Sequence, residues 1–165
     1  MKKLSSVFFA LVLSTLTQTS SAQQNPPFKL KEISYGIYTS RTIAREAIAD
    51  SVSISHGQVA GQTLVTQTDQ VPAKLGTQFG SEYQLTGSAK DSVTLEIEWI
   101  YPREVNDTVK HTHYRSIRYP IVMPANAANA SSYSLDENFE LIRGIWILNI
   151  FSDNKKIFTR KFHLN

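Results

Sequence analysis

The chain has 165 residues and no cysteine, and its 17 Lys and Arg stand against 14 Asp and Glu. Without cysteine it has neither disulfides nor the acceptor residue of a bacterial lipoprotein, so its fold must depend on an apolar core. Two of the basic residues, Lys2 and Lys3, open the chain, and the remaining 15 basic and 14 acidic residues nearly cancel. The charge balance therefore gives no reason to expect nucleic acid as a partner.

The first 22 residues have the pattern of an export signal. A basic start at residues 2–3 precedes an apolar stretch over residues 7–16, and small residues follow at 20–22. The apolar stretch is shorter than the roughly twenty residues of a membrane-spanning helix. We expect cleavage after Ala22, which would leave no membrane-spanning segment.

With the export signal assigned, the chain is predicted to have three parts. Residues 1–22 form the signal peptide, residues 23–29 a flexible leader, and residues 30–165 a single domain. A compact chain of this size hides roughly two-thirds of its surface, which suffices for a core without covalent crosslinks.

The domain is predicted to be all-β and mostly antiparallel, because short runs of β-branched and aromatic residues alternate with Gly, Pro, Asn and Asp. The clearest strand is SVTLEIEWIY, residues 92–101, whose apolar positions point one way while Thr94, Glu96 and Glu98 point to solvent. In the segment ISYGIYT the alternation predicts one shared face for its apolar side chains, Ile33, Tyr35 and Ile37.

Two segments are predicted to depart from strand structure. Apolar residues at helical spacing in RTIAREAIAD, residues 41–50, indicate either a short helix or an irregular crossing loop, since so short a helix is marginal in water. The biased segment PANAANASS, residues 124–132, is expected to be an exposed loop.

The C-terminal stretch GIWILNIFSDNKKIFTRKFHL predicts a hairpin with two alternative registers. A two-residue turn at residues 153–154 sets Trp146 opposite Lys161, whereas a three-residue loop over residues 153–155 sets Trp146 opposite Phe162. The second register buries more aromatic surface across the strands, and we therefore favour it.

The segment VPAKLGTQFGSEYQLTG, residues 71–87, predicts an inter-strand corner. Pro72 fixes its own backbone and ends the preceding strand. Positive φ angles are expected at Gly76 and Gly80, so that the chain turns twice around two apolar side chains that plug the corner. The residues with this structural role are Pro72, Leu75, Gly76, Phe79, Gly80, Tyr83 and Gly87.

The run TDQVPAKLGTQFGSEYQLTG, with GIYTSRT upstream, resembles a bacterial family known only as a domain of unknown function. The resemblance extends over roughly residues 30–164. The ending GIW…DNKKIFTRKF is similar to the last hairpin of immunoglobulin-like accessory domains, in which Gly144, Trp146 and Phe162 would have structural roles. The resemblance implies an immunoglobulin-like antiparallel β-sandwich that is exported to the periplasm, or secreted, by a Gram-negative bacterium. It implies no catalytic or binding residues.

His111 and His113 are the candidates for a metal site, because one residue separates them and both would point the same way on a strand. The acidic pair Glu96 and Glu98 would lie on the opposite face of the sheet, unless a β-bulge near Pro102 reverses the parity. A half-exposed histidine pair without a metal is the favoured interpretation, and no cofactor is expected.

A binding surface is predicted in the tract HTHYRSIRYP, which interleaves Tyr114 and Tyr119 with Arg115 and Arg118. Such side chains bind acidic sugars and other polar polymers by stacking and by charge-assisted hydrogen bonds. The alternative is an ordinary strand whose side chains alternate between core and solvent.

No pattern of catalytic residues is present. The chain lacks a Gly-x-Ser-x-Gly elbow, its histidines at positions 56 and 163 are isolated, and its glycines do not have the spacing of a phosphate-binding loop. The leading hypothesis is therefore a non-enzymatic envelope module that binds another envelope protein through a sheet face or a free edge strand. A periplasmic small-ligand or metal-binding protein centred on His111, His113 and Tyr114 is the alternative, and an envelope hydrolase is the third.

Overall fold

The computed structural model describes residues 28–47, 55–107 and 112–165. Within these residues the chain forms nine strands and one 3-10 turn. In chain order they are β1 (Lys29–Ala47), β2 (Ser55–Thr66), β3 (Gln70–Val71), β4 (Gln78–Thr86), β5 (Ser92–Asp107), β6 (Thr112–Pro124), β7 (Ala128–Ser134), η1 (Asn138–Glu140), β8 (Gly144–Ser152) and β9 (Lys155–Leu164).

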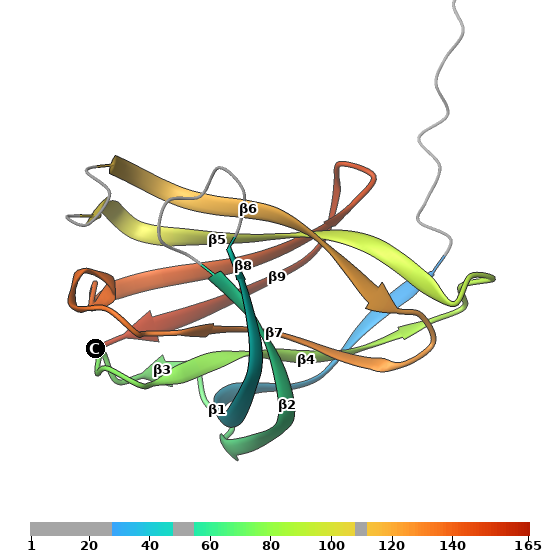
Figure 1. The fold of residues 1–165 in the computed structure, drawn as a ribbon, viewed down its shortest axis with the longest axis horizontal. Helices are drawn as coiled ribbons and strands as arrows, with labels where there is room; N and C mark the ends of the chain where they lie inside the picture. Colours follow the sequence, from blue (N-terminus) through green and yellow to red (C-terminus); the bar gives the residue numbers. More distant parts are fainter. Residues whose placement is uncertain (1–27, 48–54, 108–111) are drawn as a thin grey trace, which may run out of the picture.

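The strands form two sheets (Figure 1). One has the order β2-β1-β4-β7 and the other has the order β3-β9-β8-β5-β6. Neighbouring strands are antiparallel except for the two-residue β3, which runs parallel to β9. The predicted all-β, mostly antiparallel fold is confirmed.

Aromatic side chains fill the space between the sheets. Phe79 of β4 lies at its centre, with ring centroids 5.5 Å from Trp99, 5.7 Å from Trp146 and 5.2 Å from Phe162, all in edge-to-face geometry. All four rings are fully buried. Because Phe79 comes from the four-stranded sheet and its neighbours from the other, these contacts hold the two sheets together.

The alternation predicted for β5 is confirmed. Its inward side chains are buried, and they are Val93, Leu95, Ile97, Trp99 and Tyr101. Thr94, Glu96 and Glu98 lie on the outer face, at least partly exposed. Strand β5 therefore separates an apolar interior from a polar outer face.

The favoured register of the last hairpin is also confirmed, although its turn differs from the prediction. Trp146 pairs with Phe162. The turn itself has two residues, Asp153 and Asn154, with φ of 49° and 61°. A register shift between Ile150 and Phe151 supplies the extra residue that the three-residue loop was expected to provide. The aromatic pairing is thus kept by a tight turn together with a bulge.

The expected helix or crossing loop over residues 41–50 is wrong for the part that the structure describes. Residues 41–47 belong to β1, which pairs with β2 from Ile37 to Ala47. The ladder with β2 supplies hydrogen-bond partners from a second strand, whereas an isolated helix of this length is marginal in water. Residues 48–50 lie outside the described residues.

Two further predictions about the strands are wrong. The segment 124–132 is a loop only at residues 125–127, because β7 begins at Ala128 and pairs with β4. Ile33 does not share a buried face with Tyr35 and Ile37. A register shift between residues 32 and 34 turns its side chain outward, where half of it is exposed.

The corner at residues 71–87 is built differently from the prediction. Gly76 has a φ of 80°, as expected, but Leu75 is 45% exposed and does not plug the corner. Gly80 has no positive φ, because it already lies inside β4. A Cβ atom at Gly80 would lie 2.2 Å from the backbone oxygen of Ser131, so this glycine permits close approach of β7.

Candidate functional site

The predicted binding tract lies on β6, the edge strand of the five-stranded sheet. Ile117 pairs with Trp99, and the register then shifts between Ile100 and Val105 of β5. This irregularity surrounds Pro102, where a bulge was the alternative to unbroken alternation. It changes which side chains of β6 face the core.

The two tyrosines of the tract point to the interior. The ring of Tyr114 packs edge-to-face against Tyr101, with 5.5 Å between centroids. Tyr119 packs against the core, and burial raises its pKa. Arg115 and Arg118 are exposed instead. The four residues therefore do not form one continuous surface, because strand alternation and the irregularity send the rings inward and the guanidinium groups outward.

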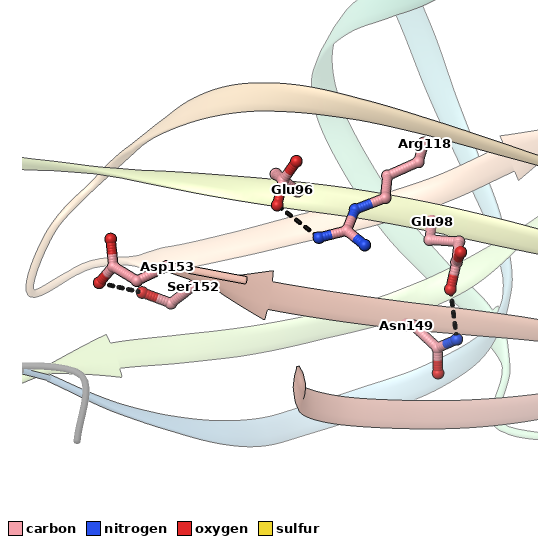
Figure 2. Close-up of polar contacts among 6 residues, drawn as sticks. All are labelled: Glu96, Glu98, Arg118, Asn149, Ser152 and Asp153. Atoms are coloured by element: carbon pink, nitrogen blue, oxygen red, sulfur yellow. Dashed lines mark hydrogen bonds and ion pairs between the residues drawn. The ribbon is translucent and has the colours of Figure 1, made fainter. Parts of the chain in front are cut away.

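Arg118 is held on the outer face by two neighbours. Its Nη2 lies 2.6 Å from Oε2 of Glu96, as Figure 2 shows, and its Cζ lies 3.9 Å from the ring centroid of Phe151. About a third of each side chain of the ion pair is exposed, so the pair itself adds little stability. Its effect is to fix the guanidinium group above β8.

A row of polar side chains crosses the same face beside Arg118. Thr159 Oγ1 donates to Asn149 Oδ1 at 2.8 Å. Asn149 Nδ2 in turn donates to Glu98 Oε2 at 2.7 Å, a hydrogen bond that is drawn in Figure 2. Asn149 is only 3% exposed. We call Thr159, Asn149 and Glu98 the outer polar row. It links β9, β8 and β5 and makes this face a rigid, hydrogen-bonded surface.

The sequence reasoning missed Asn149 and Phe151. Both are outward positions of a strand that reads as continuously apolar, and the signal available was the single amide in ILNIF. Exposed apolar groups also accompany this face, since Val122 of β6 is 66% exposed and Ile145 of β8 is 44% exposed. Apolar groups mixed with a fixed arginine are the usual composition of a protein-binding surface.

In the part of the chain that is described, the metal candidate His113 is not brought together with the acidic pair Glu96 and Glu98. His111 lies outside the described residues. His113 pairs with Asn106, and its Nδ1 lies 3.9 Å from Oε1 of Glu104. Across β6, Glu98 is paired with Arg118 rather than with a histidine. Among residues 28–47, 55–107 and 112–165 there is no group of three side chains suited to a metal ion.

A buried tyrosine–glutamate cluster is the second polar feature that the sequence reasoning missed. The Tyr101 and Tyr133 hydroxyl oxygens lie 3.2 Å apart, and the Tyr133 hydroxyl donates to Glu140 Oε1 at 2.6 Å. Glu140 Oε2 accepts from the N–H groups of Asp136 and Glu137, both at 2.8 Å. Burial raises the pKa of Glu140. Glu140 is 6% exposed, and its carboxylate joins two backbone N–H groups of the β7–β8 connection to Tyr133 of β7, so it holds that connection in place.

Comparisons with known proteins agree with this architecture. A crystal structure of an immunoglobulin-like protein from Pseudomonas aeruginosa superposes with a TM-score of 0.61 at 23% identity, covering 88% of this chain and 100% of that chain. An alkylpurine DNA glycosylase from Pseudomonas fluorescens, bound to DNA containing an abasic site analog, gives a TM-score of 0.35 at 10% identity over 59% of this chain and 28% of that one. That second likeness is too weak to support an inference. No curated protein matches the sequence.

The first likeness shows the immunoglobulin-like fold, so the predicted immunoglobulin-like antiparallel β-sandwich is confirmed. Within the described residues, no helix has the length and apolar character needed to cross a membrane. Residues 28–164 match a family whose description is a domain of unknown function. The chain belongs to that family, DUF3859.

Proposed function

We propose that the protein is an exported, non-enzymatic interaction module of the bacterial envelope, located in the periplasm or secreted, and that it binds a protein partner through β6. The observation that carries the proposal is that β6 has 13 residues and, within the described residues, pairs on one side only, with β5. Immunoglobulin-like sandwiches commonly recruit partners at such edges, by adding a strand to the sheet. The export pattern of residues 1–22 supports the location.

The sequence of β6 limits where a partner strand pairs. Pro120 and Pro124 have no N–H to donate, so the uninterrupted part of the edge extends from Thr112 to Tyr119. Arg115 and Arg118 lie in this part, exposed to a partner. Pairing through this stretch places the partner beside the exposed guanidinium groups of β6, with β6 between the partner and the outer polar row.

The environment of the acidic groups supports a role without catalysis. Glu140 is enclosed by its three hydrogen-bond donors, and Glu96 and Glu98 are engaged by Arg118 and Asn149. None of these carboxylates lies beside a serine nucleophile and a histidine base among the contacts of the described residues. Binding through main-chain groups requires no such constellation.

A photocrosslinking experiment in the native host tests the proposal. The photoreactive residue p-benzoylphenylalanine replaces Arg115 on β6 in one strain and Lys90, between β4 and β5, in another. We expect a discrete crosslinked protein from position 115 and none from position 90. A second variant, Ser116→Pro, removes one backbone donor from β6, and we expect it to weaken the crosslinked band.

Location is measured in the same strains by fractionation and by the mass of the isolated chain. The proposal predicts a chain that starts at Gln23 in the periplasmic or extracellular fraction. Equal crosslinking from both positions, or an uncleaved chain in the cytoplasmic fraction, contradicts the proposal.

A further inference from the structure

A second pair of strand edges meets on the side of the sandwich opposite β6. Strand β3 pairs with β9 only at His163 and Leu164, so residues 155–161 of β9 have a strand neighbour only on the β8 side within the described residues. Likewise β1 pairs with β2 only from Ile37 onward, so residues 29–35 have a strand neighbour only on the β4 side. We call these two stretches, 29–35 and 155–161, the β1–β9 seam.

The two strands of the seam face each other across the sandwich. Arg160 of β9 donates through Nε to Oε1 of Glu32 at 2.9 Å and through Nη2 to the other carboxylate oxygen. Its guanidinium carbon lies 3.9 Å from the ring centroid of Tyr35. These contacts hold the sheets at a fixed separation along the seam. The chain that follows β2 passes close to Gly36, where a Cβ would lie 2.9 Å from the Thr68 nitrogen, and closes one end.

The inward side chains of the seam are apolar but incompletely covered. Leu30, Tyr35 and Phe158 pack against the core, yet each is only partly buried. By comparison, Ile117 of β6, on the opposite margin of the five-stranded sheet, is 6% exposed. The seam therefore leaves apolar surface accessible between two unpaired strand edges.

Four of the outward side chains of the seam are basic, beside the exposed Ile33 and Thr159. Lys29 and Lys31 of β1 and Lys156 and Lys161 of β9 are exposed. None of the four forms an ion pair with the described part of the chain. The single carboxylate of the two stretches, that of Glu32, is already bound by Arg160. The accessible edge is consequently flanked by uncompensated positive charge on both sheets.

We propose that the seam binds an extended segment of another protein, in which apolar and acidic residues alternate, as an added strand beside β9. A strand in this position alternates its side chains between the two faces of the sheet. One set faces the half-covered Leu30, Tyr35 and Phe158, and the other lies next to Lys156 and Lys161. Residues 29–35 extend over about 20 Å, which fits about seven residues of partner.

The charges oppose a second copy of the chain as the occupant. Pairing β9 with β9 brings Lys156 and Lys161 of both copies close together, and edge lysines are a common protection against such pairing. An acidic segment would instead be attracted by these lysines. This surface lies beyond the proposed function at β6, on the other margin of the five-stranded sheet, so each of the two can fail without the other.

The test uses the chain from Gln23 to Asn165 and a defined probe, an acetylated and amidated peptide that alternates Glu with Val over about seven residues. We expect saturable binding, with amide NMR shifts confined to residues 29–35 and 155–161. The double variant Lys156→Glu with Lys161→Glu should bind this probe about tenfold more weakly. It should bind the corresponding Lys and Val peptide better than the wild-type chain does.

Two controls separate strand addition from general attraction of charge. Lys90→Glu with Arg143→Glu makes the same change of net charge away from the seam and should leave the affinity unchanged. A peptide of the same composition with its Glu and Val residues in two blocks should bind more weakly than the alternating one. The proposal is overturned if the two double variants weaken binding equally or if both peptides bind with equal affinity. It is also overturned if the amide NMR shifts map to β6.

Discussion

Removal of the buried carboxylate of Glu140 should strongly destabilise the fold. The substitution Glu140→Ala leaves the N–H groups of Asp136 and Glu137 without an acceptor, and it leaves the Tyr133 hydroxyl only the Tyr101 oxygen at 3.2 Å. Each stranded donor costs about 1–3 kcal/mol, and water that enters the new space recovers part of this. We expect a loss of about 4 kcal/mol in the free energy of unfolding, which is a large share of the total stability of a typical domain.

Urea unfolding of the chain from Gln23, followed by tryptophan fluorescence, measures this loss. Glu140→Gln is the matched control, because its oxygen still accepts from the two backbone N–H groups while its amide donates to the Tyr133 oxygen. We expect the control to lose less than about 1 kcal/mol, because each donor keeps a partner and no charge remains buried. A Glu140→Ala variant within about 1 kcal/mol of the wild type at an unchanged m-value would refute the assigned role.

The same pair of proteins gives a pH dependence whose sign follows from the structure. Burial raises the pKa of Glu140 above its unfolded value of 4.5. The folded state therefore holds this proton more tightly than the unfolded state, and stability rises as the pH falls through the folded pKa towards 4.5. Glu140→Gln lacks this titration. The stability of the wild type relative to Glu140→Gln should increase on acidification from neutral pH, and a decrease contradicts the buried environment.

Three further predictions concern particular positions of the fold, each measured by thermal unfolding. Gly80→Ala should lower the free energy of unfolding by about 3 kcal/mol or more, since its Cβ would lie 2.2 Å from the backbone of β7. Gly76→Ala should lower it by about 1 kcal/mol, because only the positive φ of Gly76 opposes the change. Leu75→Ser should change stability by no more than about 0.5 kcal/mol, since that side chain is 45% exposed. Asn154→Val should cost about 1–2 kcal/mol, because a φ of 61° suits Asn and opposes a β-branched residue, and an unchanged melting temperature would contradict the turn geometry.

The sequence predicted the buried and exposed positions of a strand correctly where one face was consistently apolar and the other consistently polar. In β5 every second residue is apolar, so the burial of Trp99 and the exposure of Glu96 followed directly. The same reasoning was wrong at Ile33, because a bulge inserts one residue and inverts the parity beyond it. Bulges depend on the register of the neighbouring strand, and that register is a tertiary property which a local pattern does not contain.

The polar sites depend on the same non-local information. Glu140 and Tyr133 are seven residues apart, but their hydrogen bond requires η1 to fold back over the end of the sandwich. Arg160 and Glu32 are separated by 128 residues and meet only because β9 and β1 face each other across the two sheets. The sequence shows that these segments contain basic and acidic residues. Which of these residues form an ion pair or a hydrogen bond depends on the order of the strands in the fold.

The segment at residues 68–87 that carries the family resemblance connects the two sheets instead of presenting a surface. Val71 pairs with Leu164, the Ala73 N–H donates to the Asn165 oxygen at 2.9 Å, and the Gly76 N–H donates to the Leu135 oxygen at 2.8 Å. These bonds join β3 and the β3–β4 connection to the C-terminal end of the chain and to the residue that follows β7. Residues that serve geometry in this way identify a fold without specifying what it binds. The two binding surfaces proposed above, at the edges of β6 and β9, accordingly lie outside this segment.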